Sequence, residues 1–449
     1  MKNSLTFQAF LDQQWQDIAE LTFDEFNLIE VAYLGDYSFQ HYLADNWHAF
    51  SINYPVELFG YRVDNGWLPI LDDITPAGAG RRYWLNYLGL AHLSEPEQNF
   101  RLLESATIAP IGHLRIKQAV ENLPIGENRS FDIEEVVNRH ADFLDYANQM
   151  GAIAGGATGA GGEAPKLVLR VTSNDKVWID HQQLADGPYD AQDSYYLVKF
   201  PRGTRSEIDC DILRAEFHYY QELASLGFDT IETTQMRLIE GERYPSLWLP
   251  RFDVRQNKQG QIQRLAMESV YAMLKQQPAT RLYHGQTIRA LIDIMNKSNM
   301  TTEGFKLDKT AFVIEWVKRD LLNIAFGNSD NHGRNTAFLR SEHSIWLSPI
   351  YDLAPMKADP EGIARSMIWQ NDNGQTLELG GHYNFIAICE SLADLIEPSV
   401  LLDELKQTAE QLVDLPKRLQ QRGVSEKILS HPAIAFDYLP KRLQDWGLL

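Results

Sequence analysis

Residues 320–339, DLLNIAFGNSDNHGRNTAFL, constrain the fold and chemistry of this chain more than any other stretch. Apolar residues recur at helical spacing before it, which predicts an amphipathic helix that ends at Gly327. A polar loop, residues 330–335, follows, and the residues after the loop alternate as in a β-strand. Because a loop between a packed helix and a strand is held rigidly, this stretch is suited to carry a catalytic site.

Two side chains of the loop have a spacing that phosphoryl transfer explains. Asp330 and Asn335 are five residues apart, as are the Asp and the Asn of the protein-kinase catalytic loop. In that chemistry a carboxylate accepts the proton of the acceptor hydroxyl, and the carboxamide holds Mg²⁺. A second metal ligand, Asp352, follows a predicted hairpin over residues 336–347. The alternative is a polar turn in which Asp330 and Asn335 only cap backbone groups.

Upstream, a glycine-rich run precedes two short predicted strands. Residues 151–165 contain six glycines, and Gly161 and Gly162 lie just before Lys166 and the strands at 166–171 and 177–180. Such a run is either a flexible linker or a loop whose backbone N–H groups approach phosphates. The strands that follow favour the phosphate loop, because a glycine loop covers the nucleotide phosphates in kinases.

The next elements follow the order of a kinase N-lobe. Lys199 stands in an apolar strand, where a lysine is rare unless it is paired or faces phosphates. A predicted helix over residues 213–226 carries Glu216, a candidate ion-pair partner for this lysine, and two more strands follow. Arg251 and Phe252 then fall where a hinge would meet the adenine ring.

GNSDNHGRNTAFL together with LSPIYDLAPM, at residues 347–356, resembles the HipA family of serine/threonine-kinase toxins from bacterial toxin–antitoxin systems. The resemblance is best over residues 155–358, and it implies an α+β, bilobal, protein-kinase-like fold. It divides the chain into an N-terminal subdomain (residues 1–115), a kinase N-lobe with the glycine-rich loop (116–255) and a mainly helical C-lobe (256–449). Within the N-terminal subdomain, the apolar runs at residues 31–34 and 49–52 predict strands.

The resemblance also assigns roles to these residues. Asp330 is the catalytic base, and Asn335 and Asp352 hold Mg²⁺. The residues assigned to ATP are Gly161, Gly162, Lys166, Lys199, Glu216, Arg251, Phe252 and His332, of which His332 braces the catalytic loop. By the same resemblance the acceptor is a protein hydroxyl, as on an aminoacyl-tRNA synthetase, and a small helix-turn-helix antitoxin is the restraining partner. Two alternatives stay open: a non-catalytic nucleotide-binding regulatory protein, and a kinase of small molecules or lipids.

Composition limits the partners and the location. The 449 residues carry a net charge of −20, so contact with DNA is expected only indirectly, through a basic partner. No apolar run is long enough for a membrane span, and no signal peptide follows Met1, so we expect a cytoplasmic protein that does not bind membranes. Two cysteines far apart, Cys210 and Cys389, argue against a disulfide framework and a zinc site.

The glycine-rich run departs from the family at one point. HipA-like kinases commonly carry a serine there whose phosphorylation switches the enzyme off, whereas residues 151–165 contain no serine. Thr158 is the one hydroxyl in the run. We therefore expect that this chain is not silenced by a phosphoserine in that loop.

Overall fold

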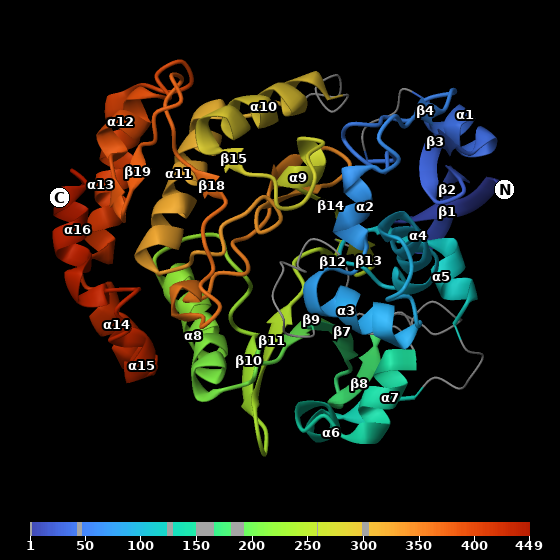
Figure 1. The fold of residues 1–449 in the computed structure, drawn as a ribbon, viewed down its shortest axis with the longest axis horizontal. Helices are drawn as coiled ribbons and strands as arrows, with labels where there is room; N and C mark the ends of the chain where they lie inside the picture. Colours follow the sequence, from blue (N-terminus) through green and yellow to red (C-terminus); the bar gives the residue numbers. More distant parts are fainter. Residues whose placement is uncertain are drawn as a thin grey trace.

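The computed structural model describes residues 2–42, 47–123, 129–149, 166–180, 193–257, 259–298 and 305–449. These residues form a mixed α+β structure in which the blue N-terminal elements and the orange-to-red C-terminal helices lie at opposite ends of the view (Figure 1). None of the described helices has the length and apolarity needed to cross a bilayer.

The N-terminal part is built on a five-stranded antiparallel sheet in the order β4-β3-β2-β1-β5. Asp12 and Gln13 both have positive φ, and this two-residue turn joins the first two strands as a tight hairpin. The strands are β1 (Lys2–Leu11), β2 (Gln14–Asp24), β3 (Asn27–Tyr33), β4 (Tyr61–Arg62) and β5 (Leu114–Ile116). The helices are α1 (Gly35–His41), α2 (Pro69–Ile74), α3 (Gly78–Tyr87), α4 (Glu95–Ala106) and α5 (Lys117–Glu121).

Residues 31–33 of the strand predicted at 31–34 lie in β3, but the strand predicted at 49–52 is wrong. There the hydroxyl of Ser51 and the N–H of Ile52 both donate to the carboxylate of Glu268, at 2.7 and 2.8 Å. The segment therefore bonds to a side chain that lies more than two hundred residues away, and not to a neighbouring strand.

The middle part is a six-stranded antiparallel sheet in the order β10-β11-β9-β7-β8-β6, with the long helix α8 against it. Its strands are β6 (Phe131–Asp132), β7 (Lys166–Val171), β8 (Lys176–Ile179), β9 (Ser194–Lys199), β10 (Arg237–Glu240) and β11 (Pro245–Pro250). Its helices are α6 (Ile133–Val137), α7 (Ala141–Gln149) and α8 (Glu207–Ser225).

Both faces of this sheet are covered. Val198 and Trp248 pack in one core with residues of the N-terminal sheet, whereas Leu197 and Leu247 pack in another core with α8 and the C-terminal helices. Because successive side chains of a strand point to opposite faces, Lys199 shares the face of Leu197. This alternation directs Lys199 toward α8 and the C-terminal part.

The C-terminal part is mainly helical, with short strands at its inner side. The three-stranded sheet β14-β16-β17 contains the hairpin predicted at residues 336–347. The strands are β12 (Val254–Gln256), β13 (Ile262–Arg264), β14 (Ala266–Ser269), β15 (Leu282–Tyr283), β16 (Ala337–Arg340), β17 (Ile345–Leu347), β18 (Met367–Ile368), β19 (Glu378–Leu379) and β20 (His382–Tyr383). The α-helices are α9 (Val270–Met273), α10 (His284–Lys297), α11 (Lys309–Ala325), α12 (Phe385–Glu390), α13 (Pro398–Leu412), α14 (Leu415–Arg422), α15 (Glu426–Leu429) and α16 (Leu439–Asp445), and the 3₁₀ helices are η3 (Met356–Ala358) and η4 (Phe436–Tyr438).

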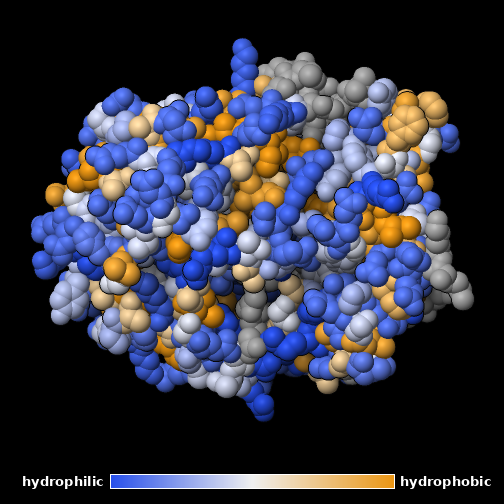
Figure 2. Space-filling model, turned by 45° about the horizontal axis from the view of Figure 1, so that its top comes forward, coloured by the Kyte–Doolittle hydropathy of each residue, from blue (hydrophilic) through white to orange (hydrophobic). Residues whose placement is uncertain are grey.

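The surface agrees with the acidic, polar composition. Most of the face in Figure 2 is hydrophilic, and its hydrophobic residues form separate groups. Exposed large hydrophobic side chains do occur, among them Phe39 and Phe59 in the N-terminal part and Leu379 and Tyr438 in the C-terminal part.

Candidate active site

The loop that carries Asp330 begins where α11 ends. Gly327 closes the helix with a φ of +73°, and a β-carbon at this position would lie 2.8 Å from Cγ2 of Ile434. Asn328 then turns the chain, since its Oδ1 accepts a hydrogen bond from the N–H of Asp330 at 3.1 Å. Packing and a side-chain cap thus fix the start of the loop.

A buried polar network holds the middle of the loop. Nδ2 of Asn331 donates to Oδ1 of Asp320 at 2.7 Å, and Asp320 also accepts from Arg365 at 3.0 Å and from Nε1 of Trp369 at 2.8 Å. Burial alone would raise the pKa of Asp320, but the charges of Arg365 and His284 and the hydrogen bonds from Trp369 and Arg365 together lower the pKa. The sequence did not point to Arg365 or Trp369, because both come from a segment that follows Asp352 and has no motif of its own.

Asn335 is oriented by the loop itself. Its Nδ2 donates to the backbone carbonyl of Asp330 at 2.7 Å, whereas its Oδ1 is buried and has no hydrogen-bond partner among the described residues. A buried carbonyl oxygen without a donor is unusual in a native protein. The arrangement leaves this oxygen available for a ligand.

His332 contacts the carboxylate of Asp330 and braces the turn. Its Nε2 lies 3.4 Å from Oδ1 of Asp330, and its Nδ1 accepts from the N–H of Arg334 at 3.1 Å. Burial lowers the pKa of His332 and outweighs the opposing effect of Asp330. At neutral pH the ring is therefore uncharged, which suits a residue that orients the loop.

Asp352 follows β17 and lies between two lysines. Its φ of +54° is in the left-handed region, which Asp tolerates better than most residues. Its Oδ2 is 3.0 Å from Nζ of Lys166, and its Oδ1 contacts Nζ of Lys199. Burial alone would raise the pKa of Asp352, but the two ammonium groups outweigh it and lower the pKa strongly.

The two lysines meet because of strand register. Lys166 pairs directly with Lys199 in the β7–β9 ladder, so both side chains leave the sheet on the same face. Burial disfavours the charge on both groups; Asp352 and Glu216 overcome this at Lys199 and raise its pKa, whereas the pKa of Lys166 is lowered. Nζ of Lys199 is 2.6 Å from Oε1 of Glu216 in α8. The same oxygen accepts from the hydroxyl of Tyr220 at 2.6 Å.

The loop, Asp352 and the two lysines are thus brought to one place. Lys166, Lys199, Glu216, Asp330 and Asp352 all line one small cavity, of about 70 Å³, between the middle sheet and the C-terminal part. The groups assigned to the catalytic base, the phosphates and one metal position therefore face a common space.

The model of the family described as HipA-like C-terminal domain matches residues 158–416, more than half of the chain. This chain belongs to that family. A solved structure described as the HipA, HipB and operator DNA complex of the Shewanella oneidensis MR-1 toxin–antitoxin system matches with a TM-score of 0.63 and 18% identity. The match covers 99% of this chain and 97% of that one, and it confirms the expected kinase-like fold with an added N-terminal part.

Two further comparisons were made, one with a second solved structure and one with curated proteins. The Helicobacter pylori proinflammatory kinase CtkA matches with a TM-score of 0.37 and 12% identity, over 57% of this chain and 86% of that one. A search of curated proteins gave no match.

Arg251 and Phe252, at the predicted adenine contact, differ in how far their groups are already used by the fold. The N–H of Phe252 makes no hydrogen bond to any described residue, and the ring of Phe252 lies 5.5 Å from that of Tyr351. The guanidinium of Arg251 is buried between Asp180 and Asp253, at 2.7 and 2.5 Å. The side chain of Arg251 therefore serves the structure, and its N–H donates to the carbonyl of Tyr195 at 2.9 Å.

An apolar slot lies beside this segment. Leu197, Leu249, Phe252 and Tyr351 line a narrow cavity of about 20 Å³ that shares Lys199 and Asp352 with the cavity around the ion pairs. The two spaces are thus neighbours. Gly161 and Gly162, which are predicted to cover the phosphates, lie outside the described residues.

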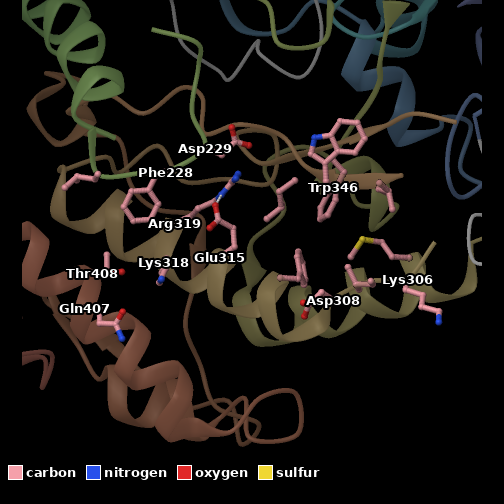
Figure 3. Close-up of a pocket in the computed structure, with 18 of the residues that line it drawn as sticks. Phe228, Asp229, Lys306, Asp308, Glu315, Lys318, Arg319, Trp346, Gln407 and Thr408 are labelled. Atoms are coloured by element: carbon pink, nitrogen blue, oxygen red, sulfur yellow. Dashed lines mark hydrogen bonds and ion pairs between the residues drawn. The ribbon is translucent and has the colours of Figure 1, made fainter. Parts of the chain in front are cut away.

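A larger cavity lies elsewhere among the described residues. A space of about 600 Å³ lies beside the β16–β17 hairpin, between α11, α13 and Trp346 (Figure 3). Phe228, Asp229 and Arg319 also line it. Arg319 bonds to Oε1 of Glu315 at 2.7 Å and to the carbonyl of Ser348 at the same distance. None of the described residues assigned to ATP lines this cavity.

The donor set at the candidate site fits Mg²⁺. The unpaired Oδ1 of Asn335 and the carboxylate of Asp352 are hard oxygen ligands, which Mg²⁺ prefers. In kinases the remaining positions are filled by phosphate oxygens and water, so two protein ligands are sufficient.

Proposed function

We propose that this protein is a HipA-like serine/threonine kinase that transfers the γ-phosphate of ATP to a hydroxyl of another protein. The observation that carries the proposal is the common cavity lined by Lys199, Glu216, Asp330 and Asp352. In a protein kinase, these four residue types bind the phosphates, position the lysine, act as the base and bind the metal, respectively. Membership of the HipA-like C-terminal domain family supports the same function.

Each residue has a defined task in this reaction. Lys199, held by Glu216, binds the α- and β-phosphates, and Lys166 adds a second cation on the same face of the sheet. Asp330 orients the acceptor hydroxyl and accepts its proton. Asn335 and Asp352 hold Mg²⁺, which neutralises phosphate charge when it is bound.

The main chain and the apolar slot would place the base of the nucleotide. The N–H of Phe252, which bonds to no residue that the structure describes, is a hydrogen-bond donor for the adenine edge, while Leu197 and Leu249 offer apolar surface to its faces. Such contacts orient ATP so that the γ-phosphate is directed toward Asp330. Gly161 and Gly162 are proposed to cover the phosphates.

We further propose that the protein acts as the toxin of a toxin–antitoxin pair. The Shewanella structure that shares its fold over nearly the whole chain is described with HipB and operator DNA. The net charge of −20 supports contact with DNA only through a partner, for which a small helix-turn-helix antitoxin is suited. An aminoacyl-tRNA synthetase as substrate, and a location in the cytoplasm, are further parts of this proposal.

Radiolabelled ATP tests the reaction directly. The protein is incubated with Mg²⁺, [γ-³²P]ATP and a bacterial extract, and label is followed into protein bands and into small molecules. Label in a protein band that disappears with the Asp330→Asn variant supports the proposal. Label in a small molecule would identify a small-molecule or lipid kinase, and ATP binding without transfer would identify a regulatory protein.

A further inference from the structure

A second acidic residue of α8, Glu222, is held as firmly as Glu216. Its side chain is fully buried, and its two oxygens each meet one arginine: Oε1 is 2.6 Å from Nε of Arg418, and Oε2 is 2.6 Å from Nε of Arg422. Both arginines belong to α14, and Arg422 also donates to the hydroxyl of Ser225 at 2.9 Å. Figure 1 shows α14 and α15 next to α8, at the end of the molecule far from the N-terminal sheet.

Glu216 and Glu222 lie on different faces of one helix. Six residues correspond to about 9 Å along the axis and to roughly 120° around it. Glu216 faces the cleft and Lys199, whereas Glu222 faces α14. Between them, the ring of Tyr219 packs edge-on against Phe326, 4.9 Å away, at the end of α11. A contact that fixes Glu222 therefore fixes the rotation and the height of the helix that presents Glu216.

We infer that Glu222, with Arg418 and Arg422, is a positioning residue that sets α8 so that Glu216 meets Lys199. This inference rests on the proposed kinase function, in which the pair of Lys199 and Glu216 must be in place for ATP binding. The family match ends at residue 416, so both arginines lie just beyond it. The segment after the family domain thus contributes to the geometry of the site.

The other ion pair between α8 and the C-terminal segment does not have this capacity. Lys427 of α15 contacts Glu207 at the start of α8, but the two side chains are 53% and 73% exposed. Exposed pairs contribute little, because water and salt screen them. Lys427→Ala therefore removes an ion pair between α8 and the neighbouring helix α15 without disturbing a buried charge, and it is a matched control.

The test measures ATP affinity and helix order in the full chain. Glu222→Gln should raise the Kd for Mg-ATP about tenfold, within the range of roughly 5–150-fold typical of coupled sites. Lys427→Ala should leave the Kd within about twofold of the parent. In a Glu216→Gln background the Glu222→Gln change should have almost no further effect on the Kd, because the two residues act through the same contact.

Hydrogen exchange gives a second readout that needs no nucleotide. Backbone amides of α8 around Glu216 should exchange faster in Glu222→Gln than in the parent and in Lys427→Ala. If Glu222→Gln does not fold, Arg422→Gln, which leaves Arg418 in place, should show the same changes to a smaller extent.

Two results would overturn the inference: unchanged exchange in α8, or a loss of ATP affinity that is the same with and without Glu216. A parent protein that fails to bind ATP would instead refute the proposed function, and the exchange measurement would still decide the role of Glu222.

Discussion

Replacing Asp352 by Asn tests the metal site and the ion cluster together. Asn keeps the shape of the side chain and tolerates the left-handed backbone at this position, so the fold of the segment should persist. The charge that both lysines contact is lost, although Lys199 keeps Glu216 at 2.6 Å. Removing one partner of a buried ion pair costs about 3–5 kcal/mol, and we expect the free energy of unfolding at pH 7 to fall by that amount.

The response to nucleotide separates the metal role from this loss of stability. At a Mg-ATP concentration of about 100 times Kd, the parent should gain about 2.7 kcal/mol. If the lost carboxylate contributes about 3 kcal/mol to Mg-ATP binding, the Kd rises roughly 150-fold. At the same concentration the variant should then gain only about 0.3 kcal/mol.

Urea unfolding followed by tryptophan fluorescence, with and without Mg-ATP, measures both quantities. Glu268→Gln is the control, because it makes a comparable change in a buried carboxylate that bonds to Arg340 at 3.2 Å, outside the candidate site. It should be less stable than the parent but keep the full gain from Mg-ATP. An equal gain in Asp352→Asn and in the parent would refute the assignment of Asp352 as a metal ligand.

Three further predictions concern the loop and the pH dependence. Asp330→Asn should lower the rate of transfer by roughly 10²–10³ while the Kd for ATP, measured by titration calorimetry, stays within about threefold. Gly333→Ala would bring a β-carbon to 2.9 Å from the ring of Tyr271, and steady-state kinetics should show a roughly hundredfold fall in transfer from the displaced loop. The pKa of Asp352 is lowered in the folded protein, so its carboxylate stabilises the fold above the unfolded pKa of about 3.9, and this stabilisation is lost as the pH falls further. The difference in unfolding free energy between the parent and Asp352→Asn should therefore be constant at pH 6–8 and shrink below about pH 4.

The chemistry of the site could be predicted from the sequence because it depends on local spacing. Asp330 and Asn335 belong to one loop, and Lys199 is conspicuous as a cation in an apolar strand. The structure pairs Lys199 with Glu216, as the order of elements suggested, and it also places Asp352 against Lys199, which the sequence did not indicate. The roles of these residues in catalysis and metal binding stay predictions.

The support of the site could not be predicted, because it depends on contacts between distant segments. Arg365 bonds to Asp320, which lies 45 residues earlier in the chain. Arg251 bonds to Asp180, and no local sequence pattern predicts this contact. The segment at residues 49–52 shows the same limit, since its hydrogen bonds go to Glu268. In each case a tertiary contact decides what the local sequence leaves open.

The central strands β9 and β11 of the middle sheet are covered on both faces, and this limits how the chain can be divided. Tyr196, Val198 and Trp248 pack into the same core as the N-terminal strands. A kinase truncated at residue 116 would expose these side chains to water and would be prone to aggregate. The N-terminal part therefore belongs to the same folding unit as the middle sheet. A protein that binds the N-terminal part would contact the part of the chain that packs against the sheet of Lys166 and Lys199.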